Sequence, residues 1–308
     1  MIQTLTVLQL ILIVAVILYM TANIIYLVRL QPVVQPISNP PRISVCVPAR
    51  NEERGVEACL QSLLNQDYLN FEVIAIDDHS TDSTTEIMQA LAQEHSHLKV
   101  LEGINLPEDW LGKPFALHQA FKIAQGEYLL FTDADLVFKS TALNTAVHVM
   151  RERELDMLTL MPQVEFGSFW ERAVQPVIFG FIASLTRFKN VNNPDHKSAM
   201  GFGAFLMFRR AAYEKIGGHE AGKADVLEDV LIAKRAKRAG LKLLVADGKQ
   251  LFSIRMYFGL KEIWFGWQKN MFLAMNKSVA KATYNIFVVL GFLFTPYIIL
   301  AINIYFYF

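Results

Sequence analysis

Two carboxylates, Asp133 and Asp135, stand one residue apart directly after an uncharged apolar run at residues 128–131. A continuous apolar run predicts a strand that is buried on both faces. In an open α/β sheet, ligands bind in the crevice beyond the carboxyl ends of the strands. Hard divalent cations prefer oxygen ligands, and Mg²⁺ is typically held by one or two carboxylates together with substrate phosphates. The pair therefore predicts a divalent-cation site, and a solvated turn or a helix cap is the alternative interpretation.

Two other predicted strands also end in polar clusters. Residues 43–47 lead into the cluster PARNEE at 48–53, and residues 71–76 lead into DDHSTD at 77–82. Because the carboxyl ends of parallel strands lie on one edge of a sheet, the three clusters should converge in space. One such cluster is an ordinary turn, but three that are rich in carboxylate are costly unless they bind something.

The clusters belong to an alternating pattern of strands and helices. Strands are predicted at residues 43–47, 71–76, 99–101 and 128–132, and helices at 57–64, 84–93 and 113–124. This rhythm predicts an α/β fold, Rossmann-like, with a mainly parallel sheet and helices on both faces.

Composition narrows the class of protein. The 29 basic and 29 acidic side chains balance, which argues against nucleic acid as a partner. The hydrophobic share of 53% exceeds that of an average soluble domain, because an apolar run lies near each end. Cys46 and Cys59 fall within apolar patterns and are predicted to be core residues, as in a protein from a reducing compartment.

The first apolar run, residues 5–28, carries no charge and is long enough to cross a hydrocarbon core of about 30 Å. It lacks a basic start and is too long for a signal peptide, so residues 1–30 are predicted to be a transmembrane anchor. By the positive-inside rule, the arginines that follow place the middle of the chain in the cytoplasm; they are Arg29, Arg42, Arg50 and Arg54. Four prolines within residues 31–41 predict an extended spacer.

The second run, residues 284–308, is also free of charge and predicts a transmembrane helix over residues 283–308. Residues 251–282 mix aromatic and basic side chains, which predicts amphipathic helices lying in the headgroup layer. Residues 169–188 are predicted to be either a similar interfacial helix or a buried core helix. The domain that carries the strand-end clusters is predicted over residues 42–250.

Five motifs, in order within residues 43–270, resemble those of family 2 glycosyltransferases with the GT-A fold. They are VPARNE at 47–52, DDHSTDST at 77–84, GKPFAL at 112–117, TDAD at 132–135 and EDV at 228–230. One departure is His79, which stands where the family usually has glycine. The resemblance implies an inverting, metal-dependent transfer of one sugar from a nucleotide-sugar, with UDP as the preferred nucleotide.

The resemblance also implies roles for the motif residues. Asp135, with Asp133 behind it, would hold Mg²⁺ or Mn²⁺ on the diphosphate, and Asp229, next to Glu228, would take the proton of the acceptor hydroxyl. Contacts to the substrates are expected from Pro48, Arg50, Glu52, Asp77, Asp78, Lys113, Asp133, Ala134, Gly201, Gly203 and Gln268. Considered without the other motifs, Asp229 would be interpreted as a helix cap, and Lys113 as a surface lysine at the start of a helix.

The acceptor is predicted from the membrane-associated parts of the chain. In the family's polymer-extruding members an interfacial helix carries Q-x-x-R-W, whereas residues 268–272 are QKNMF. Residues 266–270 are instead similar to enzymes that glycosylate carotenoid- or hopanoid-type lipids. Our hypothesis is transfer to a lipid hydroxyl at the cytoplasmic face, with Gly201 and Gly203 lining the acceptor pocket because glycines allow close backbone approach.

A close alternative is a polyprenyl-phosphate sugar transferase, which would need no strong general base. A second alternative is a membrane-anchored nucleotide-sugar-binding protein without turnover, and the presence of both Asp135 and Asp229 argues against it. A dinucleotide-dependent oxidoreductase is disfavoured because no G-x-G-x-x-G follows the first predicted strand.

Overall fold

A computed structural model of the chain describes residues 2–274 and 278–307. An eight-stranded sheet in the order β1-β10-β7-β9-β5-β2-β3-β4 forms its centre, next to a three-stranded sheet in the order β6-β11-β8. The strands are β1 (Val28–Arg29), β2 (Ile43–Ala49), β3 (Phe71–Asp77), β4 (Leu98–Glu102), β5 (Tyr128–Phe131), β6 (Leu136–Phe138), β7 (Met157–Met161), β8 (Gln163–Val164), β9 (Leu206–Arg209), β10 (Leu243–Asp247) and β11 (Phe252–Ile254). In the large sheet only β9 runs antiparallel to its neighbours, so the predicted mainly parallel sheet is confirmed.

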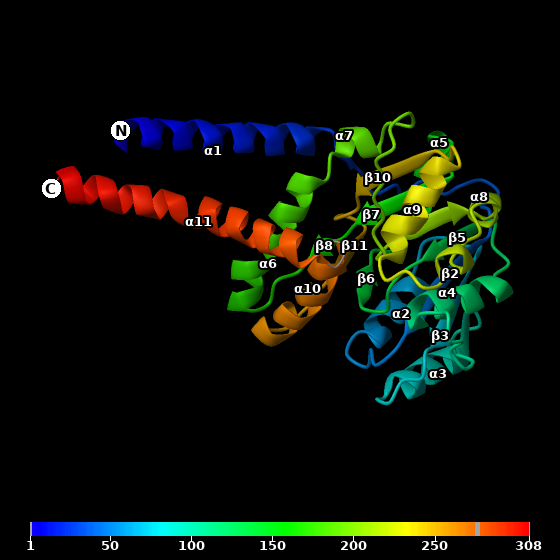
Figure 1. Cartoon of the computed structure of the whole chain (residues 1–308). Helices are drawn as coiled ribbons and strands as arrows, with labels where there is room; N and C mark the ends of the chain where they lie inside the picture. Colours follow the sequence, from blue (N-terminus) through cyan, green and yellow to red (C-terminus); the bar gives the residue numbers. More distant parts are fainter. Residues whose placement is uncertain (1, 275–277, 308) are drawn as a thin grey trace.

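Helices cover both faces of this sheet (Figure 1). They are α1 (Ile2–Ile25), α2 (Val56–Leu64), α3 (Thr84–Glu94), α4 (Gly112–Ile123), α5 (Ala142–Glu152), α6 (Phe169–Leu185), α7 (Phe188–Val191), α8 (Arg210–Lys215), α9 (Glu228–Arg238), α10 (Leu260–Ala274) and α11 (Val279–Tyr307). The alternation of side chains along β2 explains the two layers: Val45 and Val47 pack in a core with α2, α3 and α5. Cys46 packs in a second core with α4 and α9.

The order of the strands brings the three polar clusters together. β2 lies between β3 and β5, with Ala49 opposite Asp77 and Cys46 opposite Phe131 in the register. All three strands run in the same direction, so their carboxyl ends share one edge of the sheet. The convergence that the sequence predicted is therefore present.

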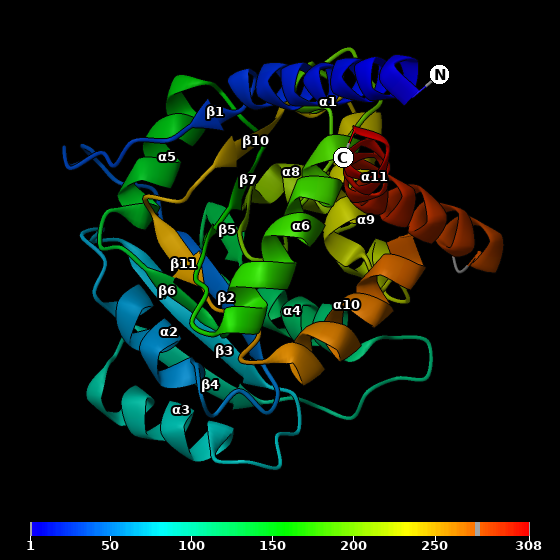
Figure 2. The ribbon, with the colours of Figure 1, turned by 90° about the vertical axis from the view of Figure 1, so that its left-hand side faces the viewer.

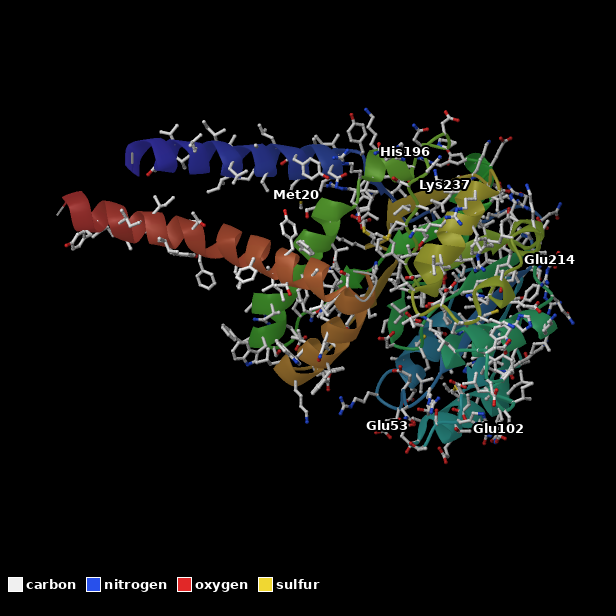
Figure 3. All side chains as sticks on the ribbon, in the orientation of Figure 1. Met20, Glu53, Glu102, His196, Glu214 and Lys237 are labelled. Carbon is white, nitrogen blue, oxygen red and sulfur yellow. The ribbon has the colours of Figure 1, made fainter. Side chains whose placement is uncertain are left out.

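Two long helices extend from one side of the α/β body, and both chain ends lie there (Figure 1). The helices α6 and α10 lie on the side of the sheet from which these extensions start (Figure 1), and α6 lies in front of the sheet in the second view (Figure 2). Within the described residues, one helical segment, Thr6–Ile25, is long and apolar enough to cross a membrane, with a mean hydropathy of 2.4. Most of this helix extends beyond the α/β body (Figure 3), and near its end the side-chain amide of Asn23 donates to the carbonyl oxygens of Ala183 and Thr186. The same criterion does not select α11, so the C-terminal span remains a prediction.

The proline-rich spacer lies against the domain. Leu30, next to β1, is buried, and the Val33 amide donates a hydrogen bond to Thr145 Oγ1 (2.9 Å). The amide of Asn144 donates to the carbonyl oxygens of Val33 and Gln35. The segment is thus fixed along α5 and contributes to the domain surface.

The prediction of interfacial helices over residues 251–282 is wrong at its beginning. Leu251 is fully buried, and the next residues form β11, because Phe252 stacks on Phe138 of the partner strand β6. The helix begins only at Leu260, and residues 275–277 lie outside the described part. For residues 169–188, the exposed Phe169, at 72%, and Trp170 exclude a buried core helix at the start of α6.

Candidate active site

Lys113, in the first turn of α4, joins two carboxylates that are far apart in the sequence. Its Nζ lies 2.6 Å from Asp133 Oδ1 and 3.0 Å from Glu228 Oε1. Burial alone would lower the pKa of Lys113, but these carboxylates outweigh that effect and hold the pKa well above its usual value. The lysine is therefore a permanent positive charge in an acidic cluster.

Asp229 is held at the start of α9 through both of its carboxylate oxygens. The Gly203 amide donates to Oδ2 at 3.0 Å, and the Val230 amide donates to Oδ1 at 2.7 Å. Burial, and then the neighbouring charge of Glu228, nevertheless raise the pKa of Asp229 to about 6. The result is an oriented carboxylate whose affinity for a proton is higher than usual.

Gly201 and Gly203 permit the backbone to approach this cluster. A Cβ at Gly203 would lie 3.0 Å from Lys113 Nζ and 3.6 Å from Asp229 Oδ2. A Cβ at Gly201 would overlap the backbone carbonyl oxygen of Asp229. These glycines allow a close approach within the protein itself, by Gly201 to the Asp229 backbone and by Gly203 to the Lys113 ammonium and the Asp229 carboxylate.

We expect Gly201→Ala to lower the free energy of unfolding by about 1–3 kcal/mol, because the obstacle is backbone and a rigid group cannot yield. Thermal unfolding in detergent measures the effect. The matched control is Gly180→Ala, since a Cβ there meets nothing within 4 Å and alanine is favoured inside a helix. Equal midpoints for the two variants would contradict the tight contact at Gly201.

Asp135 presents a buried oxygen, Oδ1, that has no hydrogen-bond partner. Burial and the charge of Asp133 raise the pKa of Asp135 to about 6, and burial followed by Asp135 and Asp133 raises that of Glu52 to about 7. A bound cation would offset this repulsion, so the donor set suits a hard divalent metal. No group of three His, Cys, Asp or Glu side chains suited to a metal occurs among the described residues, so phosphate or water oxygens would have to complete the shell.

The loops after β2 and β3 are joined to each other by hydrogen bonds. The Thr81 amide donates to Asn51 Oδ1, and the Glu52 amide donates to Thr84 Oγ1. Asn51 and His79 both have positive φ angles, 56° and 58°. Such a conformation favours glycine. It therefore fits the glycine that the resembled motif usually has where this chain has His79.

Asp78 lies at the junction of three motifs. Its Oδ2 forms an ion pair with Arg50 at 3.5 Å, and a Cβ added to Gly112 would lie 2.5 Å from the same oxygen. Asp77 instead stabilises the turn, because its Oδ1 accepts a hydrogen bond from the Ser80 amide. Pro48 lies half-buried within β2.

Two predicted contact residues lie apart from this cluster. The side chain of Ala134 is 3% exposed and belongs to the core, which leaves only its backbone for a ligand. Gln268 is exposed on α10, and the described residues show no contact between it and the acidic cluster.

A cleft of about 460 Å³ opens next to Asp135 and Glu52. Its opposite wall contains Arg255, Phe258 and Glu262, which follow β11. Arg54 pairs with Glu262 at 3.4 Å, and the guanidinium of Arg255 lies 4.3 Å from the Phe258 ring centroid. Sequence reasoning missed this wall because the mixture of aromatic and basic residues was assigned entirely to the membrane interface.

Comparison with solved structures defines the class of fold. A mannosyltransferase, PcManGT from Pyrobaculum calidifontis in complex with GDP-Man and Mn²⁺, superposes with a TM-score of 0.55 at 22% identity, over 80% of this chain and 68% of that one. TarS residues 1–349 from Staphylococcus aureus in complex with UDP-GlcNAc gives 0.53 at 21% identity, over 72% and 60%. The protein thus has a GT-A-like α/β fold.

The sequence comparison identifies the family. The model of glycosyl transferase family 2 matches residues 44–217, and the chain belongs to this family. The 4,4'-diaponeurosporenoate glycosyltransferase of Staphylococcus haemolyticus is 25% identical over 232 residues, which are 74% of this chain and 60% of the relative. Glycosyltransferase GlyG of Streptococcus pneumoniae is 31% identical over 116 residues, 38% of this chain and 37% of the relative. The aligned region thus spans about three fifths of the length of the first of these relatives.

Proposed function

We propose that the protein transfers a single sugar from a UDP-sugar to a hydroxyl of a membrane lipid at the cytoplasmic face, with inversion and with a divalent metal. One observation carries the proposal. A buried, unpartnered carboxylate oxygen on Asp135, the cation Lys113 and the oriented carboxylate Asp229 meet at the carboxyl edge of one sheet. Such an edge is where an α/β fold binds its ligand.

The donor would lie across the joined loops after β2 and β3. Asp78 and Glu52 would bind the uridine, and Arg50 holds Asp78 through their ion pair. Asp133 and Asp135 would hold Mg²⁺ or Mn²⁺, which supplies charge neutralisation to the departing diphosphate. Lys113 adds a positive charge on the same side, and Glu228 keeps it in place.

Asp229 would act as the general base. Its oxygens accept from Gly203 and Val230, and an ionised carboxylate retains lone pairs for a further proton. It takes the proton of the acceptor hydroxyl while that oxygen forms a bond to the anomeric carbon. The bond from this carbon to the diphosphate breaks, and the electron pair leaves with UDP.

The choice of a lipid acceptor rests on the helices outside the sheet. The segment Thr6–Ile25 has the length and composition of a membrane span, and aromatic residues are exposed at the starts of α6 and α10, among them Phe169, Trp170 and Trp264. A relative over most of this chain is named for glycosylating 4,4'-diaponeurosporenoate. These features support an active site facing a membrane, with the C-terminal helix α11 as a second span.

The dependence of the rate on pH follows from the raised pKa of Asp229. A general base works as the carboxylate, so kcat/KM should rise with pH and level off above about pH 6, the value to which burial and Glu228 raise its pKa. An ordinary aspartate would give a plateau from about pH 4. Initial rates across pH 4–8 at saturating Mn²⁺ test this; a plateau that already begins near pH 4 would exclude Asp229 as the base.

The proposed activity is tested by incubating detergent-purified protein with radiolabelled UDP-sugars, Mn²⁺ and a membrane lipid extract. We expect label in a lipid fraction whose bond to the sugar resists mild acid, as a glycoside does. Label that mild acid releases would identify a sugar phosphate and favour a polyprenyl-phosphate acceptor. Labelling of soluble acceptors alone would contradict the lipid proposal.

A further inference from the structure

The helix α6 contains a buried glutamine whose side chain has no partner. Gln175 is fully buried, and neither its amide nitrogen nor its amide oxygen makes a hydrogen bond. Leaving a buried amide unpaired costs free energy, whereas an apolar residue of the same shape avoids the cost. The residue therefore calls for a ligand that completes its hydrogen bonds.

A second unpartnered polar group lies on the facing helix. The indole Nε1 of Trp267, on α10, is buried and has no hydrogen-bond partner. Its ring packs edge-on against Phe179 of α6, with centroids 5.5 Å apart. Because Phe179 is one helical turn beyond Gln175, the two lie on the same face of α6.

This face of α6 leads toward the candidate active site. Glu171, one turn before Gln175, is fully buried and receives two hydrogen bonds from Arg255, at 3.0 and 3.1 Å. Arg255 lines the cleft that Asp135 borders. Tyr257, two residues beyond Arg255, packs near Trp267, with ring centroids 6.3 Å apart.

We propose that Gln175 and Trp267 bind the polar head group of the acceptor lipid between α6 and α10. This inference rests on the proposed function and adds to it two binding residues and a class of acceptor. The two helices lie on the side of the body from which α1 and α11 extend (Figures 1 and 2). A lipid could thus keep its chain in the membrane while its head group reaches toward Asp135.

The chemistry of the three atoms selects the head group. The Gln175 amide nitrogen and the Trp267 indole nitrogen are donors, and the Gln175 oxygen is an acceptor. A neutral group that carries hydroxyls can accept from the first two and donate to the third. A phosphate monoester at neutral pH needs cations, and the guanidinium of Arg255 is already paired with Glu171. The site is therefore specific for a neutral, hydroxylated head group.

The test uses Gln175→Leu and Trp267→Phe in the full chain, with a lipid extract divided by anion exchange into an uncharged or zwitterionic fraction, called neutral below, and an anionic fraction. The matched control for Gln175→Leu is Gln61→Leu, which changes an exposed amide on α2. Gln175→Leu should keep or raise the thermal midpoint because it removes an unpaired buried amide. Its loss of activity would therefore not come from unfolding.

We expect wild-type transfer into the neutral fraction, and an increase of about tenfold in the KM for that fraction in each variant, as for the loss of one good hydrogen bond. The KM for the UDP-sugar should change less than twofold. An unchanged lipid KM in both variants, or transfer only into the anionic fraction, would overturn this inference while leaving the proposed transferase intact. Wild-type transfer into neither fraction would overturn the proposed function, and this inference with it.

Discussion

Asp229→Asn should lower kcat by about 10²–10⁴-fold, the usual contribution of a positioned general base. The substitution keeps the size of the side chain but removes its ability to take a proton. It also places an NH₂ group opposite one of the two amides, those of Gly203 and Val230, that now donate to the carboxylate. The KM for the UDP-sugar should change little, because Asp229 acts on the acceptor.

Steady-state rates at saturating donor and lipid measure this effect. The control is Asp195→Asn, which changes an exposed aspartate in the loop that follows α7 and should retain wild-type rates. An active Asp229→Asn enzyme would show that the acceptor needs no base. The acceptor would then be the phosphate of a polyprenyl lipid and not a hydroxyl.

Asp135→Ala is expected to lower kcat/KM by about 10²–10⁴-fold, which corresponds to the several kcal/mol that a metal ion contributes to charge stabilisation. The variant loses the carboxylate whose Oδ1 is buried without a partner. It should also require a higher Mn²⁺ concentration for half-maximal activity, because Asp133 already contacts Lys113.

A metal titration of the initial rate separates this effect from misfolding. Glu94→Ala, which removes an exposed carboxylate at the end of α3, should leave the titration unchanged. If Asp135→Ala showed the wild-type Mn²⁺ dependence, the metal would have to be held elsewhere.

Local patterns predicted the part of the α/β frame that runs from β2 to β5. Helix and strand periodicities placed these elements within two residues of their observed ends, because each buries a face whose spacing is visible in the sequence. The other strands of the large sheet, β1, β7, β9 and β10, and the small sheet β6-β11-β8 were not predicted. Their pairing is decided by partners that are distant in the sequence, such as Phe252 with Phe138.

In the candidate site, too, local motifs were predictable and distant contacts were not. Motifs located Asp133, Asp135 and Asp229. No spacing rule predicted that Lys113 would contact Glu228 or that Gly201 would lie against the Asp229 backbone. Gln175 sits in an apolar stretch like any tolerated polar residue. Its unpaired state depends on what α10 places opposite it, which only the tertiary structure can reveal.

The proposed nucleotide-sugar site is tested most directly by calorimetric binding of a nucleotide panel, UDP, GDP, CMP and NAD, to detergent-purified protein, with Mn²⁺ and with a chelator. We expect UDP to bind most tightly of the four and the chelator to abolish most of this binding. Absence of nucleotide binding, or binding that is indifferent to the metal, would mean that the carboxylates at this sheet edge do not form a nucleotide-sugar site.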